Sequence, residues 1–133
     1  MSWTELCLIV AGLYLAIRLR RAMGPRIDPV ETAAALDSGT AVLIDVREPG
    51  EWADGVAERA TLLALSDLQG SRKYWTPFLE KNRQHRLLLY CRSGARSAHA
   101  AAKLRREGFN AVNAGTLHGW RRLGWKTVQP TRP

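Results

Sequence analysis

The sequence predicts an α/β domain with a mostly parallel central sheet and helices on both of its faces. Two observations carry this prediction. Short apolar runs rich in branched residues, such as AVLIDV at 41–46 and RLLLY at 86–90, alternate with helical patterns. These runs lack the polar alternation of a half-exposed strand, so we expect strands buried on both faces. The chain has 133 residues, 46% of them hydrophobic, which is enough for one core.

The first segment reads as a membrane anchor. LCLIVAGLYLAI at 6–17 has no charged residue and is followed by Arg18. Extended from Trp3 to Leu19, the run approaches the ~20 residues that a membrane span needs. Positive charge after the run argues against a cleaved signal peptide and places the rest of the chain in the cytoplasm. The alternative is an amphipathic helix folded onto the domain, but the run has no polar face.

The predicted organisation therefore combines an N-terminal membrane helix with one domain. We expect a single-pass protein of the inner membrane whose catalytic domain faces the cytoplasm. The segments are an anchor at 1–22, a linker at 23–27, a domain at 28–129 and a tail at 130–133.

The first half of the domain begins with a helix. Asp28 is a good N-cap, Pro29 suits the first helical position, and the helix is expected to end at Gly39. The strand at 41–46 follows. REPGEW then forms a turn that leads into a short helical piece, and ATLLAL at 60–65 is expected to form a second strand.

The second half repeats the alternation. Ser66 is expected to cap a helix that starts with SDLQG, and a further helix is predicted at 73–81. The strand at 86–90 leads into a helix that starts at Ser93 or Gly94 and stops at Gly108. The remaining predicted elements are a strand FNAVN, a helix TLHGWRRLG and an extended WKTV.

The net charge and the positions of the histidines and cysteines exclude several classes of function. The net charge is +8, but the basic residues are spread along the chain, which favours attraction to small anions or anionic surfaces. No nucleic-acid-binding motif is present, so no nucleic-acid partner is predicted. The histidines share no ligand spacing, which argues against a metal site. Cys7 and Cys91 are unlikely disulfide partners, which favours a reducing compartment.

Cys91 lies where a buried strand leads into a helix. In open α/β sheets, ligands bind beyond the carboxyl ends of the strands. The free amides and dipole of a first helical turn favour an anion such as a thiolate, and Arg92 and Arg96 add positive charge. Ser93 and Gly94 allow the backbone to curl, so that several amides face one anion. The sequence therefore predicts that Cys91 is a nucleophile in an anion-binding loop.

Three segments then follow one another along the chain: LIDVREPGEWADG at 43–55, CRSGARS at 91–97 and NAGTLHGWRRLGWKTV at 113–128. The middle segment looks like the active-site loop of the rhodanese family, the thiosulfate sulfurtransferases. The first is similar to a family signature in which a strand ends in Asp-Val-Arg. The last resembles the C-terminal segment, where a glycine turn precedes a helix carrying tryptophan. The resemblance implies a rhodanese-like fold.

The resemblance also implies a reaction that needs no metal or organic cofactor. The Cys91 thiolate would attack the outer sulfur of thiosulfate, or another small anionic sulfur donor, and keep it as a persulfide. A thiol or cyanide would then accept the sulfur. The loop amides would cradle the donor, with the two arginines orienting it. The implied substrate-binding residues are Arg92, Ser93, Gly94, Ala95, Arg96 and Ser97.

Asp45 and Arg47 have supporting roles in this interpretation. By resemblance, Asp45 holds loop backbone or an arginine. Arg47 and Glu48 form a structural ion pair or part of the pocket rim.

Two other functions stay open. From Cys91 to Arg96 the loop has six residues, and phosphatases of the same fold have one more, so an arsenate reductase or phosphatase is the less favoured enzyme. The segment 55–60 lacks the histidine, proline and second glycine of the Gly-His-Ile-Pro-Gly-Ala stretch seen in many relatives, and Thr116 replaces a common glycine. These departures motivate a second alternative, a membrane-tethered binding or regulatory module without turnover. The oligomeric state is not predicted.

Overall fold

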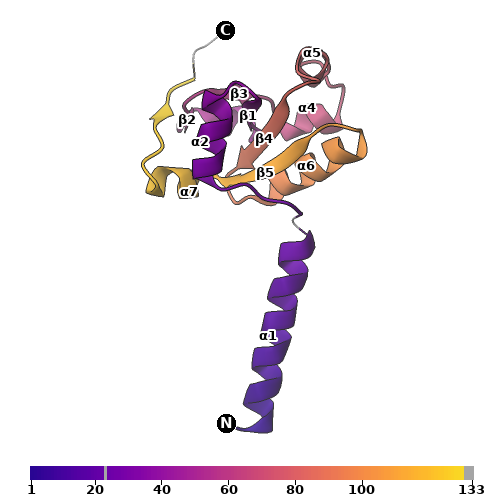
Figure 1. Cartoon of the computed structure of the whole chain (residues 1–133), viewed down its shortest axis with the longest axis vertical. Helices are drawn as coiled ribbons and strands as arrows, with labels where there is room; N and C mark the ends of the chain where they lie inside the picture. The colour runs from indigo at the N-terminus through magenta and orange to yellow at the C-terminus, as the bar shows by residue number, and fades with distance from the viewer. Residues whose placement is uncertain (23, 131–133) are drawn as a thin grey trace.

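A parallel sheet forms the centre of the domain in the computed structural model, which describes residues 1–22 and 24–130 (Figure 1). The strand order is β3-β1-β4-β5, and every neighbouring pair is parallel. The predicted mostly parallel sheet is therefore confirmed. The strands are β1 (Ala41–Asp45), β3 (Ala60–Leu62), β4 (Arg86–Cys91) and β5 (Ala111–Thr116).

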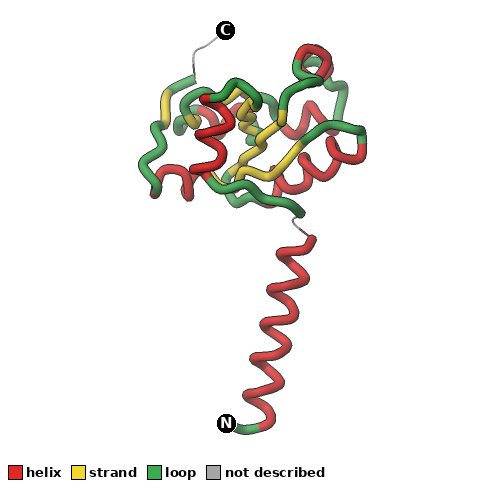
Figure 2. The backbone as a smooth tube through the Cα atoms, viewed as in Figure 1, coloured by secondary structure: helices red, strands yellow, loops and turns green. Residues whose placement is uncertain are grey.

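Helices cover both faces of this sheet, as predicted. Figure 2 shows the yellow strands between two groups of red helices. On one face, α2 and α7 pack on an apolar cluster that includes Tyr90 and Trp120. On the other, α4, α5 and α6 pack on a cluster that includes Cys91 and Leu104. The helices are α2 (Pro29–Asp37), α4 (Leu65–Gln69), α5 (Trp75–Lys81), α6 (Ala95–Arg106) and α7 (Leu117–Arg122).

The side chains of strand β4 point alternately to these two faces. Leu88 and Tyr90 belong to the cluster beneath α2 and α7. Leu87, Leu89 and Cys91 belong to the cluster beneath α6. Because successive side chains of a strand point to opposite faces, the neighbours Tyr90 and Cys91 lie in different environments.

The predicted strand at 60–65 is only half right, because β3 ends at Leu62 and Leu65 already belongs to α4. Further departures from the expected boundaries follow in the second half of the chain. Helix α4 begins at Leu65 with Ala64 as N-cap, so Ser66 is not the cap; its hydroxyl donates to Glu48 instead. Strand β5 begins later than expected, and its register against β4 shifts between Leu89 and Tyr90. Such a bulge leaves no periodic trace in a short apolar sequence.

Three short elements complete the domain. Helix α3 (Pro49–Trp52) follows β1, and β2 (Val56–Ala57) pairs antiparallel with β6 (Thr127–Val128). The extended end of the chain was predicted, but its partner strand was not, since two residues carry too little pattern. Asp28 caps α2 as predicted, accepting a hydrogen bond from the Glu31 amide at 2.8 Å.

Arg59 occupies a backbone conformation that favours glycine. Its φ is +74°, at the position where the family stretch compared above has its second glycine. The guanidinium contacts Asp37 at 2.7 Å, and both side chains are exposed. A side chain with a Cβ is strained in this region by about 1–2 kcal/mol.

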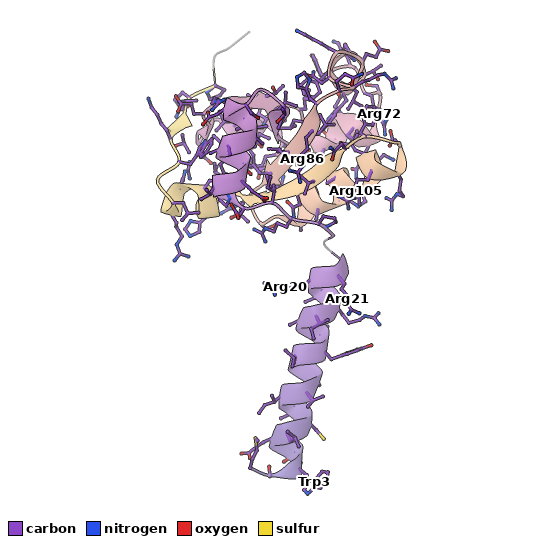
Figure 3. The ribbon with its side chains drawn as sticks, in the orientation of Figure 1. Trp3, Arg20, Arg21, Arg72, Arg86 and Arg105 are labelled. Carbon is purple, nitrogen blue, oxygen red and sulfur yellow. The ribbon has the colours of Figure 1, made fainter. Side chains whose placement is uncertain are left out.

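The N-terminal segment is a helix, α1 (Trp3–Ala22), that extends away from the domain (Figure 1). Figure 3 shows Trp3 at its far end and Arg20 and Arg21 at the end nearer the domain. Within the part of the chain that the structure describes, no helix is long and apolar enough to cross a membrane. The predicted single-pass anchor at 1–22 and the predicted inner-membrane location are therefore wrong.

The reason lies in the charges at both ends of α1. Glu5 stands in its first turn, and Arg18, Arg20 and Arg21 lie in its last turns. The longest run of α1 without a charged residue is 6–17, and its twelve residues span about 18 Å at the usual helical rise. A bilayer core is about 30 Å thick.

Candidate active site

Cys91 is the last residue of β4 and is fully buried. Its Sγ atom accepts a hydrogen bond from the Gly94 amide at 3.0 Å and from the Ser97 amide at 3.5 Å. The Ser97 hydroxyl lies 3.4 Å from the same sulfur. Three donors from one short loop therefore face a single sulfur atom, an arrangement that stabilises negative charge there.

Gly94 gives the loop its shape. It is the N-cap of α6 and has φ +87°, in the left-handed region. Its carbonyl accepts hydrogen bonds from the Ala98 amide at 3.1 Å and from the Ser97 hydroxyl at 3.2 Å. This turn brings the Gly94 amide toward the sulfur while the carbonyl bonds to the helix.

The loop divides into an inner and an outer set of residues. Gly94 and Ser97 are buried beside Cys91. The remaining predicted substrate-binding residues reach the surface: Arg92, Ser93 and Ala95 are exposed, and Arg96 is half-buried. Of the two predicted donor-orienting arginines, Arg92 is thus the one at the open side of the loop.

Arg96 is paired with Glu51. Its Nη1 and Nη2 atoms lie 2.6 Å and 2.8 Å from the two carboxylate oxygens. Hydrogen bonding to Arg96 lowers the pKa of Glu51 to about 2, and the same pair raises the pKa of Arg96 above its ordinary value. The guanidinium is therefore directed at a carboxylate of the chain, which the sequence analysis did not anticipate.

Glu51 also ties this pair to the end of β1. Its Oε2 accepts a hydrogen bond from the Glu48 amide at 2.9 Å. The Glu48 carboxylate in turn accepts from the Ser66 amide at 3.1 Å and the Ser66 hydroxyl at 2.6 Å. The spacing of two glutamates three residues apart at a helix start was the available signal for Glu51.

Asp45 and Arg47 form a buried pair. Arg47 Nη2 lies 2.8 Å from Asp45 Oδ2 and 2.7 Å from the Gly55 carbonyl oxygen. The sequence interpretation that Asp45 holds an arginine agrees with this contact, whereas Arg47 pairs with Asp45 rather than Glu48. Burial is the largest influence on Arg47 and lowers its pKa. The hydrogen bond to Asp45 and the nearby negative charges, Asp45 first, together outweigh burial and leave the pKa above its ordinary value.

Tyr90 completes this pair on the face of the sheet opposite Cys91. Its hydroxyl donates to Asp45 at 2.7 Å and accepts from the Ala57 amide at 2.9 Å. Burial, followed by the charge of Asp45, raises the pKa of Tyr90 far above its usual range. These contacts fix the connection between β1 and β2, so the group supports the scaffold of the site.

Asn113 is the second residue that the sequence analysis missed. It is fully buried in β5, and its Oδ1 atom accepts a hydrogen bond from the Ser97 hydroxyl at 2.7 Å. A polar residue within the apolar run AVNAG was the available signal. Across residues 1–22 and 24–130, no three side chains of His, Cys, Asp or Glu gather as a metal site would require.

The chain matches the family described as Rhodanese-like domain over residues 28–123. It is similar to a sulfurtransferase of Allochromatium vinosum, 35% identical over 96 residues, which are 71% of this chain and 84% of that protein. A probable adenylyltransferase/sulfurtransferase of Mycobacterium tuberculosis, MoeZ, is 38% identical over 113 residues, 82% of this chain. The chain spans about a quarter of that longer relative, 26% of its length.

Solved structures with the same fold are also similar. A rhodanese-related protein from Thermoplasma volcanium superposes with a TM-score of 0.67 at 27% identity, covering 80% of this chain and 99% of that one. The human single-domain sulfurtransferase TSTD1 gives a TM-score of 0.63 at 25% identity, covering 74% of this chain and 96% of that one.

Proposed function

Because the chain belongs to the rhodanese-like domain family, we propose that it moves sulfane sulfur through a persulfide on Cys91. The relatives named as sulfurtransferases support a role in sulfur transfer in general. The proposal adds the carrier residue, an anionic donor such as thiosulfate or a persulfide, and a thiol or cyanide acceptor. It assigns the reaction to the domain at 28–129.

One observation carries this proposal: three hydrogen-bond donors converge on Cys91 Sγ at the start of a helix. The Gly94 amide lies 3.0 Å from the sulfur, and the amide and hydroxyl of Ser97 lie 3.5 Å and 3.4 Å from it. Each of these groups can donate a hydrogen bond to an anionic sulfur, and the thiolate is the form of cysteine that attacks a sulfur donor. A structural cysteine in an apolar core has no need for such donors.

The reaction then follows in two displacements. In the first, the Cys91 thiolate attacks the outer sulfur of thiosulfate. A new bond forms to Cys91 Sγ as the sulfur–sulfur bond of thiosulfate breaks, and sulfite leaves with the electron pair. In the second, an acceptor thiolate or cyanide attacks the outer sulfur of the persulfide, and Cys91 leaves as a thiolate. The loop donors stabilise Cys91 in both its starting and its leaving form.

The remaining loop residues divide the other tasks. Arg92, an exposed residue of the loop, attracts the anionic donor. Ser93 and Ala95 line the open side, where the acceptor approaches. Arg96, held by Glu51, keeps the first turn of α6 in place. Asp45 and Arg47 act at a distance, through the β1–β2 connection.

The experiment is intact mass spectrometry after thiosulfate treatment under nonreducing conditions. We expect a gain of about one sulfur atom that dithiothreitol removes. Cys91→Ser should abolish the gain. Cys7→Ser is the matched control, since Cys7 is the chain's other cysteine and lies exposed on α1, and it should gain sulfur like the wild type.

Two outcomes would overturn the proposal. One is the absence of any adduct on a folded protein, and the other is an adduct that remains in Cys91→Ser. Assays of the same preparation with a phosphate ester and with arsenate test the alternative enzymes of this fold.

A further inference from the structure

Asn113 is a fully buried polar side chain in the middle of a core strand. It lies in β5 where the register against β4 shifts, directly beside the strand that carries Cys91. A buried amide is stable only when its donor and acceptor groups find partners. The partners of this amide belong to the Cys91 loop and to the bulge, so its contacts connect the sheet to the loop.

Two backbone groups fix the orientation of the Asn113 amide. Its Oδ1 atom accepts from the Gly115 amide at 3.0 Å, and its Nδ2 atom donates to the Gly94 carbonyl at 3.2 Å. If the amide were rotated by 180°, the Nδ2 donor would face the Gly115 N–H, and the Oδ1 acceptor would face the Gly94 carbonyl oxygen. Only one of the two orientations therefore satisfies both backbone groups.

This orientation determines the direction of the Ser97 hydroxyl. Asn113 Oδ1 lies 2.7 Å from Ser97 Oγ, and a carboxamide oxygen can only accept, so the hydroxyl donates to it. Ser97 Oγ is also 3.4 Å from Cys91 Sγ. The single hydroxyl proton thus has three acceptors within reach: the Asn113 amide oxygen at 2.7 Å, the Gly94 carbonyl oxygen at 3.2 Å and the Cys91 sulfur at 3.4 Å.

The Gly94 oxygen already accepts from Asn113 Nδ2 and from the Ala98 amide, so the protonation state of the sulfur decides between the other two acceptors. When Cys91 is a thiol, the Ser97 hydroxyl donates to Asn113 over the shorter distance and turns a lone pair toward the sulfur. When Cys91 is a thiolate, the sulfur is the stronger acceptor and draws the hydroxyl proton. Asn113 Oδ1 then retains its hydrogen bond from Gly115, so no buried group is left without a partner.

We propose that Asn113 is a positioning residue that acts on Cys91 through Ser97 and Gly94. It holds the Gly94 carbonyl on the side away from the sulfur, so that the Gly94 amide faces Cys91. It also holds the Ser97 hydroxyl at a position from which the hydroxyl can donate its hydrogen bond either to the amide oxygen or to the sulfur. The inference rests on the proposed function only in taking Cys91 as the reacting group.

The test measures the Cys91 thiolate directly by its ultraviolet absorbance as a function of pH. The absorbance of Cys91→Ser is subtracted to isolate this one group. Asn113→Asp keeps the shape of the side chain but replaces the amide with a carboxyl group. One carboxyl oxygen then contacts the Ser97 hydroxyl, which lies between it and the sulfur, and the other faces the Gly94 carbonyl. Because two neighbouring groups cannot both ionise easily, we expect the thiolate midpoint to rise by about one pH unit.

Asn113→Leu removes all three hydrogen bonds of the side chain at similar volume. With the loop no longer held, we expect kcat for sulfur transfer to fall about 10-fold. KM for thiosulfate should change little, because Asn113 is buried and does not reach the donor. Asn113→Leu should also raise the thiolate midpoint, because it releases the Ser97 hydroxyl and the Gly94 amide. In a Ser97→Ala background the same substitution should raise the midpoint less, since the two residues act along one path.

Asn82→Leu is the matched control. Asn82 is also buried and also bonds to backbone, with Nδ2 donating to the Phe78 carbonyl at 2.8 Å, but it precedes β4 at the end opposite Cys91. It should lower stability without moving the thiolate midpoint. An Asn113→Leu protein that folds and titrates like the wild type overturns the inference, as does an equal shift in Asn82→Leu.

Ser97→Ala carries the test if the leucine variant does not fold, because it removes the hydroxyl that links Asn113 to the sulfur. An unchanged thiolate midpoint in that variant overturns the inference. The titration reports on the thiolate whether or not sulfur is transferred. Failure of this inference and failure of the proposed function are therefore distinguishable.

Discussion

Arg96 and Glu51 form a two-pronged ion pair, with N–O distances of 2.6 Å and 2.8 Å, between residues that lie 45 positions apart. The pair joins the Cys91 loop to the turn after β1, the two segments whose motifs resemble the rhodanese family. Both side chains are about one-third exposed, so water screens their attraction in part. The main effect of the Arg96–Glu51 pair is geometric, since a bidentate contact fixes the guanidinium in direction as well as position.

Glu51→Gln should therefore slow sulfur transfer without weakening donor binding. The change removes the carboxylate that orients Arg96 and leaves more positive charge at the loop. We expect kcat to fall severalfold, while KM for thiosulfate stays level or decreases. Steady-state kinetics with cyanide as acceptor measure both constants. Glu80→Gln, which neutralises an exposed carboxylate on α5, is the control, and a rise in KM for Glu51→Gln would contradict the expectation.

The same pair predicts a pH-dependent stability. Hydrogen bonding to Arg96 lowers the folded-state pKa of Glu51 from 4.5 to about 2. A lowered carboxyl pKa stabilises the folded state above the unfolded pKa, and the stabilisation is lost as the pH falls from about 4.5 to about 2. With the discount for exposure, we expect Glu51→Gln to lose about 1 kcal/mol at neutral pH.

Urea unfolding at neutral pH and in acid checks this expectation. The difference in unfolding free energy between wild type and Glu51→Gln should shrink through the acid range. A difference that stays constant with pH would assign the loss to packing instead.

Gly94→Ala should impair Cys91 specifically. A Cβ at φ +87° costs about 1–2 kcal/mol and disfavours the turn that points the Gly94 amide at the sulfur. Gly108→Ala is a close control, because Gly108 has φ +93° with open space around it at the far end of α6. Both variants should lose similar stability in thermal unfolding. Only Gly94→Ala should lose persulfide yield by mass spectrometry, and an equal loss in both would remove the loop amide from the mechanism.

Arg59→Gly should stabilise the fold. Arg59 has φ +74°, and glycine adopts this conformation without steric cost. The ion pair with Asp37 that is lost has both partners exposed and contributes little. We expect a gain of about 0.5–1 kcal/mol in urea unfolding. Asp37→Asn removes the ion pair alone, and a large loss in that variant would show that the pair outweighs the strain.

The elements with strong local patterns were predictable from sequence. The apolar runs gave β1 and β4, Asp28-Pro29 gave the start of α2, and the position of Cys91 followed from the order of strand and helix. The short strands β2 and β6 could not be paired in advance, because two residues carry no period. Ser66 does not cap a helix as predicted, because its hydroxyl donates a hydrogen bond to Glu48, a residue distant in the sequence.

The partners of the site residues were less predictable. Whether Arg96 faces an external anion or Glu51 depends on how α3 sits against α6, which neither segment encodes alone. Asn113 reaches the Cys91 loop only because β5 bulges beside β4. The anchor prediction failed for a different reason, since it extended an uncharged run of twelve residues across charged ends.

The alternation of β4 has a practical consequence for anyone who alters this protein. Tyr90 belongs to the cluster beneath α2 and α7, and Cys91 to the cluster beneath α6. Apolar residues beneath α2 and α7 can then be varied for stability while the layer beneath α6 is kept for reactivity, provided that Tyr90 and its hydrogen bond to Asp45 are retained. Strand β4 thus separates the side chains that an engineer can change from those that the reaction uses.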